Sequence, residues 1–212
     1  MATFRDVDGL WNGYRIEDVC TPEALQNNLS GVLDFYNMRR REVIKAEPNP
    51  AHFALAELEK VANVQIITQN VDDLHERAGS KNVLHIHGEV LKARSIENFH
   101  VQEYCDRDIL VGDLAADGHQ LRPHICFFGE TPYKFYSALE MAEQATIFAV
   151  IGTSLQVYPA AFLLDATKAT TIYVVDPEIP RFQAGKDVIP ICKPASEGVV
   201  EMVQQIREML AV

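Results

Sequence analysis

Residues 146–154 read TIFAVIGTS, an apolar, partly β-branched run that ends in a glycine and two hydroxyl side chains. A strand of a parallel sheet has this composition because both of its faces are covered. Similar apolar strands are predicted at 64–68, 83–86 and 171–175, with helical patterns between them. Short strands that alternate with helices favour an α/β fold, a Rossmann-like parallel sheet with helices on both faces.

Helices are predicted where a capping residue precedes apolar positions at helical spacing. A helical pattern runs through residues 32–45, and further helices are predicted to begin at Thr21, Asn49, after Pro159 and near Ser196. The helix after Asn49 is expected to place on its apolar side Phe53, Leu55 and Leu58.

The stretch 92–122 interrupts this alternation, because it is polar and too long for an ordinary connection. We expect it to form a small inserted lobe within one domain that spans residues 1–212. The sequence contains no internal repeat.

Net charge, apolar stretches and cysteine spacing each exclude some classes of function. The 212 residues carry 19 Lys and Arg against 30 Asp and Glu, for a net charge of −11. An acidic chain is a poor candidate for direct nucleic-acid binding, although a local basic patch can still bind an anionic ligand. No stretch approaches the roughly 18 apolar residues of a membrane helix, and residues 1–20 contain no signal-peptide core. The four cysteines show no CxxC spacing, so we expect a cytoplasmic protein with reduced thiols and no membrane partner.

Polar clusters follow the predicted strands. They are Gln-Asn-Val-Asp at 69–72, His-Gly-Glu at 87–89, Gly-Thr-Ser at 152–154, and Asp176. Ligands of parallel α/β sheets bind at the carboxyl ends of the strands. The coincidence predicts one composite site.

Each cluster also has a purely structural interpretation. The glycine and hydroxyl side chains of Gly152, Thr153 and Ser154 can contact a phosphate or ribose. The alternative is that they form an ordinary turn between a strand and a helix. Asp176 can bind ribose hydroxyls, but before a proline a turn aspartate is the favoured interpretation. The side chains of 69–72 can orient a ribose and a carboxamide, or cap a helix.

His87 ends a predicted strand, where an imidazole can act as a general base or have a structural role. His85 faces the same side, which makes a metal pair conceivable. No acidic or cysteine partner has suitable spacing, so we predict no metal site.

Tyr36 and Arg39 are three residues apart on a predicted helix and share one face. Together they can bind a carboxylate, through the guanidinium and the phenol hydroxyl. The alternative is that residues 39–41, three arginines in a row, form a solvated basic face.

Five ordered motifs resemble the sirtuin family. They are TFRD at 3–6 with DGLW at 8–11, TQNVDDLH at 68–75 with Ala-Gly at 78–79, HGE at 87–89, RPH at 122–124 through FGE at 128–130, and GTSLQV at 152–157 with PAA at 159–161. Their order and spacing match the family along nearly the whole chain.

The resemblance implies an NAD-dependent protein-lysine deacylase that consumes NAD as a co-substrate. Its partners would be acyl-lysine proteins or peptides, and its products nicotinamide and O-acyl-ADP-ribose. His87 would be the general base for a hydroxyl of the nicotinamide ribose. Gln69 and Asn70 would orient that ribose and nearby water, and Asp72 would hold the carboxamide.

The remaining roles are implied in the same way. Residues that would contact the nicotinamide ribose and its leaving group are Phe4 and Arg5. Residues that would contact the rest of NAD are Gly152, Thr153, Ser154 and Asp176. Residues that would pair with the substrate backbone or shape the acyl-lysine tunnel are Phe128, Gly129, Glu130 and Val157.

The resemblance extends to Tyr36 and Arg39, which match the Tyr-x-x-Arg pair of class III sirtuins. In those proteins the pair binds succinyl, malonyl or glutaryl carboxylates. An anionic acyl group buried in a tunnel needs a paired cation, so acidic acyl groups become the expected substrates. The alternatives are plain deacetylation, ADP-ribosyl transfer or NAD cleavage by the same site, and a catalytically impaired binding or interaction module.

Two features depart from the family. The inserted lobe holds Cys105 alone and Cys126 follows it, whereas the family usually has a four-cysteine zinc ribbon, so we expect no structural zinc. Met1 and Ala2 stand where the family has a strand and a GAGxS segment that cradles the NAD pyrophosphate. We therefore expect a sheet that lacks the usual first strand, because of a late start or a degenerate form.

Overall fold

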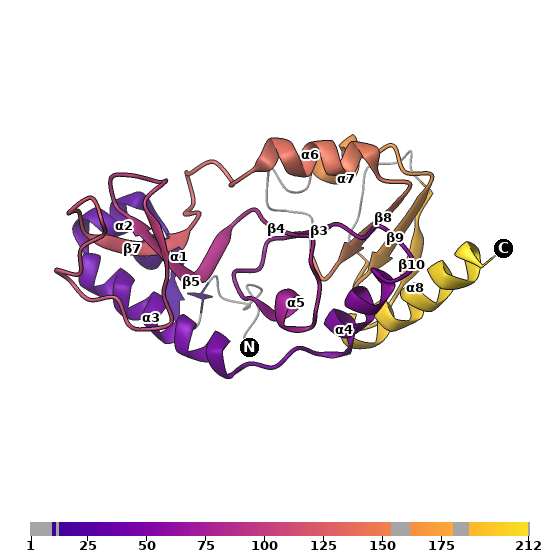
Figure 1. Cartoon of the computed structure of the whole chain (residues 1–212), viewed down its shortest axis with the longest axis horizontal. Helices are drawn as coiled ribbons and strands as arrows, with labels where there is room; N and C mark the ends of the chain where they lie inside the picture. Colours follow the sequence, from indigo (N-terminus) through magenta and orange to yellow (C-terminus); the bar gives the residue numbers. More distant parts are fainter. Residues whose placement is uncertain (1–9, 12, 154–161, 180–186, 212) are drawn as a thin grey trace. The chain divides into compact units, whose positions relative to one another are not determined.

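The computed structural model describes residues 10–11, 13–153, 162–179 and 187–211 (Figure 1). The chain forms two compact units. Unit 1 comprises Met1–Ala46, Gln69–Asp73 and His85–Tyr133, and unit 2 comprises Glu47–Thr68, Leu74–Leu84 and Lys134–Val212.

Unit 2 is built on a parallel three-stranded sheet with the order β10-β9-β8. Its strands are β8 (Ile147–Ile151), β9 (Thr171–Val175) and β10 (Ile189–Ile191), and β9 pairs in parallel with both neighbours. The two strands predicted from the sequence are present, whereas β10 was not predicted, because Ile189, Pro190 and Ile191 are too short a run to show a period.

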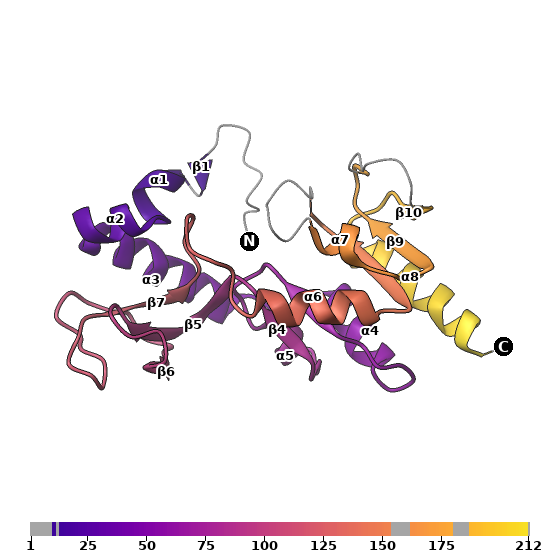
Figure 2. The same ribbon diagram turned by 90° about the horizontal axis from the view of Figure 1, so that it is seen from above.

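Side chains of β9 alternate between two hydrophobic clusters. Tyr173 and Val175 pack in a cluster with residues of α4 (Pro50–Leu58) and α8 (Ala195–Leu210). Ile172 and Val174 pack in another with Leu164 of α7 (Phe162–Ala166). Helices thus cover both faces of the sheet, which Figure 2 shows as α7 and α8 on opposite sides of β9. The predicted α/β fold is confirmed.

The remaining elements of unit 2 are α5, α6 and the pair β3-β4. Strands β3 (Ile66–Thr68) and β4 (Val83–His85) form a two-stranded sheet, and α5 spans Leu74–Arg77. Helix α6 (Phe135–Gln144) follows Lys134, which adopts a left-handed conformation with φ of 52° and makes no side-chain cap. No capping residue marks the start of α6, which explains why this helix was not predicted from the sequence.

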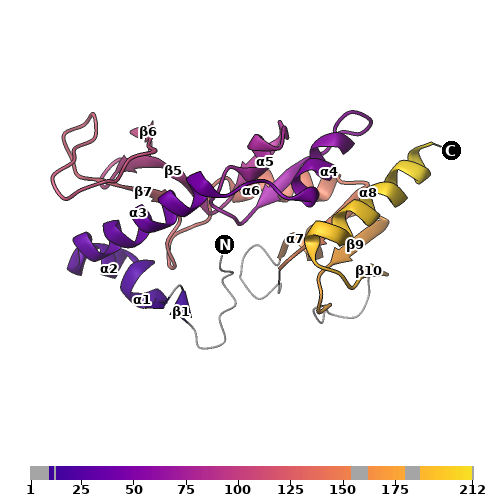
Figure 3. The same cartoon turned by 90° about the horizontal axis from the view of Figure 1, so that it is seen from below.

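Unit 1 begins with the hairpin β1 (Leu10–Trp11) and β2 (Tyr14–Arg15) and the short helix α1 (Ile16–Val19). Helix α2 (Pro22–Asn27) is capped by the Thr21 hydroxyl, which accepts from the Ala24 amide at 3.0 Å. The long helix α3 (Leu29–Lys45) packs against α1 and α2, as Figure 3 shows. The predicted helix start at Thr21 is confirmed.

An antiparallel sheet with the order β6-β5-β7 completes unit 1. Its strands are β5 (Gly88–Ser95), β6 (Gln102–Tyr104) and β7 (Leu121–Ile125), and α3 packs on β5 and β7. Residues 92–122 therefore contain the end of β5, all of β6 and the start of β7.

Helix α4 confirms the predicted start at Asn49, whose side chain accepts from the Ala51 amide at 2.9 Å. Leu55 and Leu58 are buried as predicted. Phe53 is 48% exposed, so its assignment to the apolar side was wrong. Phe53 lies 200° around the helix from Leu55, which places it away from the core that Leu55 and Leu58 join.

Candidate active site

His87 lies in the turn between β4 and β5, where the chain passes directly from one strand to the next. Its ring is half-buried and hydrogen-bonds to the backbone of Gln69. Burial lowers the pKa of the His87 imidazole below 6.5, and the hydrogen bond to Gln69 opposes this shift. The ring is therefore neutral near pH 7, which is the state that can accept a proton.

Gly88 fixes the chain on the other side of His87. Its φ of +87° is a left-handed conformation, and a Cβ atom at this position would overlap the carbonyl group of His124 on β7. The amide of Cys126 donates to the His87 carbonyl at 3.0 Å. A glycine is required here because β7 approaches the backbone next to His87 too closely for a side chain.

The Gln69–Asp72 segment follows β3 and is held against the chain around His87 by backbone contacts. The amide of Val90 donates to the Val71 carbonyl at 2.8 Å, and the ring of His85 lies 3.3 Å from the Asn70 carbonyl oxygen. Asp72 is buried, whereas Asn70 is exposed. The structure thus places the backbone of the Gln69–Asp72 segment beside His87, while the roles expected of these side chains stay predictions.

Tyr36 and Arg39 are both buried on α3, with exposures of 0% and 3%. The Tyr36 ring stacks on Phe127, with centroids 5.7 Å apart, and its hydroxyl donates to the Cys20 sulfur at 3.2 Å. Arg39 pairs with Glu42 at 2.7 Å. The alternative of a solvated basic face at 39–41 is wrong for Arg39 and Arg40 and holds for Arg41 alone, whose side chain is 54% exposed.

Glu130 of the FGE segment is the carboxylate partner of two buried arginines. Its carboxylate accepts from Arg122 at 2.8 Å, from Arg94 at 3.4 Å and from the Phe127 amide at 2.7 Å. Phe128 is 42% exposed, and its amide donates to the Cys20 carbonyl at 3.0 Å. In this segment Phe128 and Gly129 face outward, while the Glu130 carboxylate holds the loop in place.

Buried arginines are the feature of unit 1 that sequence reasoning missed. Although the chain is acidic overall, unit 1 buries the guanidinium groups of Arg39, Arg40, Arg94 and Arg122. A buried charge is costly unless it is paired or hydrogen-bonded. The signal in the sequence was weak, because an arginine beside apolar residues is usually exposed.

Unit 2 carries the other predicted residues at the ends of two adjacent parallel strands. Gly152 follows β8 with φ of +61°, has no atom within 4 Å of a Cβ position, and donates its amide to the Val175 carbonyl at 2.9 Å. Asp176 follows β9, is buried, and accepts from the Glu178 amide at 3.0 Å, as a turn aspartate does. Thr153 adjoins Gly152 at the same sheet edge. Four predicted site residues lie outside the described residues: Phe4, Arg5, Ser154 and Val157.

No metal site is visible among the described residues, where no group of three or more His, Cys, Asp or Glu side chains is arranged to hold an ion. Cys105 is buried and its thiol donates to the Arg107 carbonyl at 3.3 Å. The absence of zinc stays a prediction. None of the helices in the described ranges is both long and apolar enough to cross a membrane.

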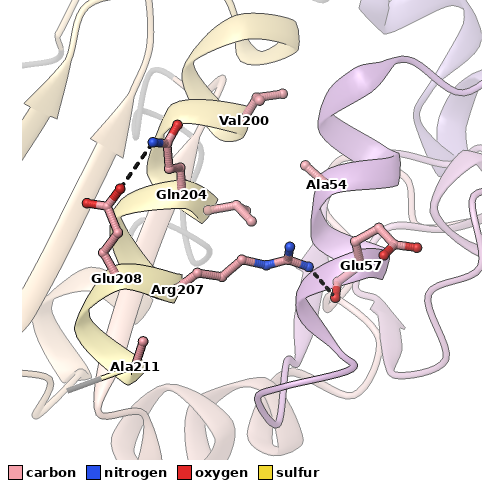
Figure 4. Close-up of a pocket in the computed structure, with 8 residues that line it drawn as sticks. Ala54, Glu57, Val200, Gln204, Arg207, Glu208 and Ala211 are labelled. Atoms are coloured by element: carbon pink, nitrogen blue, oxygen red, sulfur yellow. Dashed lines mark hydrogen bonds between the residues drawn. The ribbon is translucent and has the colours of Figure 1, made fainter.

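A shallow groove between α4 and α8 lies within unit 2 and contains none of the predicted site residues (Figure 4). Its walls include Ala54, Val200 and Val203, and Arg207 crosses it to donate to the Glu57 carbonyl at 2.9 Å. The groove is the seam where the two helices pack.

Comparison with known proteins identifies the family. Residues 1–159 match the model of the Sir2 family. A relative from Aggregatibacter actinomycetemcomitans, named NAD-dependent protein deacylase, is 57% identical over 178 residues, which cover 84% of this chain and 86% of the relative. One of the same name from Helicobacter pylori is 47% identical over 210 residues, covering 99% of this chain and 92% of the relative.

Solved structures agree. A Sir2 homologue mutant in complex with ADP-ribose superposes with a TM-score of 0.88 at 34% identity, covering 100% of this chain and 88% of the other. A Sir2 homologue in complex with NAD gives a TM-score of 0.86 at 35% identity, covering 99% and 84%. The chain belongs to the Sir2 family, the sirtuins.

Proposed function

We propose that this protein, as an NAD-dependent protein deacylase of the Sir2 family, acts preferentially on lysines that carry short acidic acyl groups such as succinyl or malonyl, with acetyl as a slower substrate. Acylated peptides are the substrates, and NAD is the co-substrate. The observation that carries the acyl preference is the burial of Tyr36 and Arg39 together on one face of α3.

The position of α3 supports this preference. Tyr36 belongs to a hydrophobic cluster that also contains Val90 of β5 and Phe127, and Val71 packs against it. These residues adjoin the segments that hold His87, the Gln69–Asp72 residues and Phe128. An acyl chain that enters beside Phe128 would therefore end near Tyr36 and Arg39.

The chemistry of the pair suits a carboxylate. Burial raises the pKa of the Tyr36 hydroxyl well above its usual range, so the hydroxyl stays protonated and can donate. The Arg39 guanidinium presents its donors in a planar fork that matches a carboxylate. Its partner Glu42 is 42% exposed, so water can solvate Glu42 when an acyl carboxylate takes its place.

Residues of unit 2, taken by itself, also suit contact with NAD. Gly152 has the open space and positive φ that let a backbone approach a phosphate, and Asp176 follows the adjacent strand, where a carboxylate can bind ribose hydroxyls. In the same proposal Thr153 and Ser154 contact the ribose-phosphate part, and Phe4 and Arg5 contact the nicotinamide ribose.

Within this proposal the acyl oxygen would bond to the nicotinamide-ribose carbon of NAD as nicotinamide leaves. A ribose hydroxyl would then attack the acyl carbon, and one water would complete the release of free lysine and O-acyl-ADP-ribose. Neutral His87 takes the proton from a ribose hydroxyl. Gln69 and Asn70 orient the ribose, and buried Asp72 holds the carboxamide. Phe128, Gly129 and Val157 bind the acyl-lysine, while Glu130 fixes the loop that presents them.

The test is a steady-state assay with NAD and two peptides that differ only in a succinyl or acetyl group on the lysine. We expect faster succinyl removal by the unmodified protein, and loss of this preference in Arg39→Met and Tyr36→Phe through a raised KM for the succinyl peptide. His87→Tyr should lose both activities. Arg41→Met removes an exposed arginine from the same helix and is the matched control.

Four outcomes would contradict parts of the proposal. Preference for acetyl together with a silent Arg39→Met would refute the acidic-acyl specificity. Nicotinamide release without peptide deacylation would indicate NAD cleavage, and ADP-ribose attached to the peptide would indicate a transferase. Binding of NAD without any turnover would indicate an impaired module.

A further inference from the structure

Arg40 is a fully buried cation in unit 1, with 0% exposure, and it is the largest of the fully buried side chains among the described residues. No carboxylate of a described residue lies within 4.0 Å of its guanidinium. Burial lowers the pKa of the Arg40 guanidinium from its usual value, which reflects the cost of removing the charge from water. A side chain kept in so costly a place calls for an explanation beyond packing.

The Arg40 guanidinium donates hydrogen bonds to two uncharged acceptors, one on β5 and one on α3. Its Nε donates to the Val90 carbonyl on β5 at 2.9 Å. Its Nη1 donates to the Asn37 side-chain oxygen at 2.7 Å, while Nη2 has no hydrogen-bond partner among the described residues. Charge-assisted bonds of this kind are stronger than neutral ones and hold their partners in a fixed geometry.

Val90 and Asn37, the residues that accept these bonds, each make further hydrogen bonds to other segments of unit 1. Val90 donates its amide to the Val71 carbonyl at 2.8 Å, so Arg40 is connected through one strand residue to the Gln69–Asp72 segment. Asn37 accepts from the Ile109 amide at 2.9 Å and donates to the Ile109 carbonyl at 2.9 Å. Arg40 therefore joins α3 to β5, to the segment beside His87 and to the 92–122 stretch.

Arg40 is also adjacent to the residues proposed to grip the acyl group. It follows Arg39 directly and lies one helical turn beyond Tyr36, since residues four apart share a face. Because β5 begins at Gly88, the Arg40–Val90 bond sets how α3 lies against the strand that follows His87. A small shift of α3 would move Tyr36 and Arg39 together.

We propose that Arg40 is a positioning residue for acyl specificity, which holds the α3 pair Tyr36 and Arg39 at a fixed distance from the segments around His87. This inference rests on the proposed preference for acidic acyl groups. Arg40 does not itself bind the acyl group. It acts through its hydrogen bonds to Val90 and Asn37.

The test compares Arg40→Met, Arg40→Lys and the control Arg41→Met. Arg41 is the next residue on α3 and makes two hydrogen bonds to Asp108, at 2.6 Å and 2.8 Å, so its substitution also removes a link between the helix and the 92–122 stretch. We expect Arg40→Met to lower kcat/KM for the succinyl peptide roughly tenfold more than for the acetyl peptide, mostly through KM. Arg40→Lys keeps the charge but not the fork, and should recover only part of the loss.

A second measurement does not depend on the substrate. Amide hydrogen exchange should be faster at Val90 and across 69–73 in folded Arg40→Met than in the unmodified protein or in Arg41→Met. Equal loss of succinyl and acetyl activity, with unchanged exchange at Val90, would overturn the inference. If the unmodified protein prefers acetyl, the proposed specificity fails, and the exchange data alone then decide whether Arg40 positions α3.

Discussion

The hydroxyl of Tyr36 donates a hydrogen bond of 3.2 Å to the thiol of Cys20, and both side chains are buried. A thiol sulfur is a weak acceptor. A carboxylate that reached the Tyr36 hydroxyl would replace the bond to Cys20 with a stronger, charge-assisted one. The same Cys20 accepts from the Phe128 amide through its carbonyl, so one residue contacts both α3, which carries the proposed acyl-binding pair, and the loop proposed to bind substrate.

Changing the acceptor at position 20 should tune acyl recognition. In Cys20→Ser a hydroxyl oxygen, a better acceptor than sulfur, competes with the substrate for Tyr36, so we expect KM for the succinyl peptide to rise about threefold. Cys20→Ala removes the competitor and should leave KM equal or lower. Acetyl kinetics measured in parallel are the control, and a rise in both KM values in both variants would show that only the fold was disturbed.

The pH dependence should report His87. Because burial lowers the pKa of this imidazole, the neutral, proton-accepting form persists below pH 6.5, and activity should fall only as the pH drops through the lowered value. The measurement is kcat/KM for the preferred peptide across the acid range. An acid limb centred above pH 6.5 would contradict the assignment of His87 as the base in this environment.

Gly88→Ala should cost far more than a substitution at another glycine with positive φ. A Cβ atom on Gly88 would overlap the His124 carbonyl, whereas one on Gly112, with φ of +96°, meets nothing within 4 Å. We expect Gly112→Ala to cost about 1–2 kcal/mol from backbone strain alone, and Gly88→Ala more than about 3 kcal/mol together with loss of deacylase activity. Chemical unfolding of both variants checks this, and equal costs would refute the close approach of β7.

His124 should make the protein sensitive to acid. Burial and the nearby arginines lower the pKa of its imidazole to about 4, and no residue in the described part of the chain hydrogen-bonds to its Nδ1. In the unfolded chain His124 takes up a proton near pH 6.5, whereas in the folded protein it does so only near pH 4. Its contribution to the free energy of unfolding is therefore fully present above pH 6.5 and is lost as the pH falls toward 4. The loss is at most about 3 kcal/mol.

The variant that checks this is His124→Phe, which keeps an aromatic ring in contact with Phe99 and Tyr133 and removes the titration. Its free energy of unfolding should fall less between pH 6.5 and 4 than that of the unmodified protein. His119→Phe removes an exposed histidine of the same unit and should preserve the acid loss. Parallel curves for all three proteins would exclude His124 as the cause.

The sequence by itself determined the local features. The caps Thr21 and Asn49, the strand at 171–175 and the polar residues after two strands are readable because a cap, an apolar period and a strand end are properties of adjacent residues. The same reasoning foresaw that the Gln69–Asp72 segment and His87 would meet, since strand ends share an edge of a sheet.

Only the tertiary structure decided which side chains are buried and what they contact. Arg39 and Arg40 are enclosed while Arg41 is exposed, although the three are identical in type and consecutive. Successive helical residues point about 100° apart, so their surroundings depend on which strand and loop cover each side of α3. The contacts of Tyr36 with Cys20, of Arg40 with Val90 and of Asn37 with Ile109 join residues 16 to 72 positions apart. Such pairs carry no local pattern, because they form only when distant segments pack against each other.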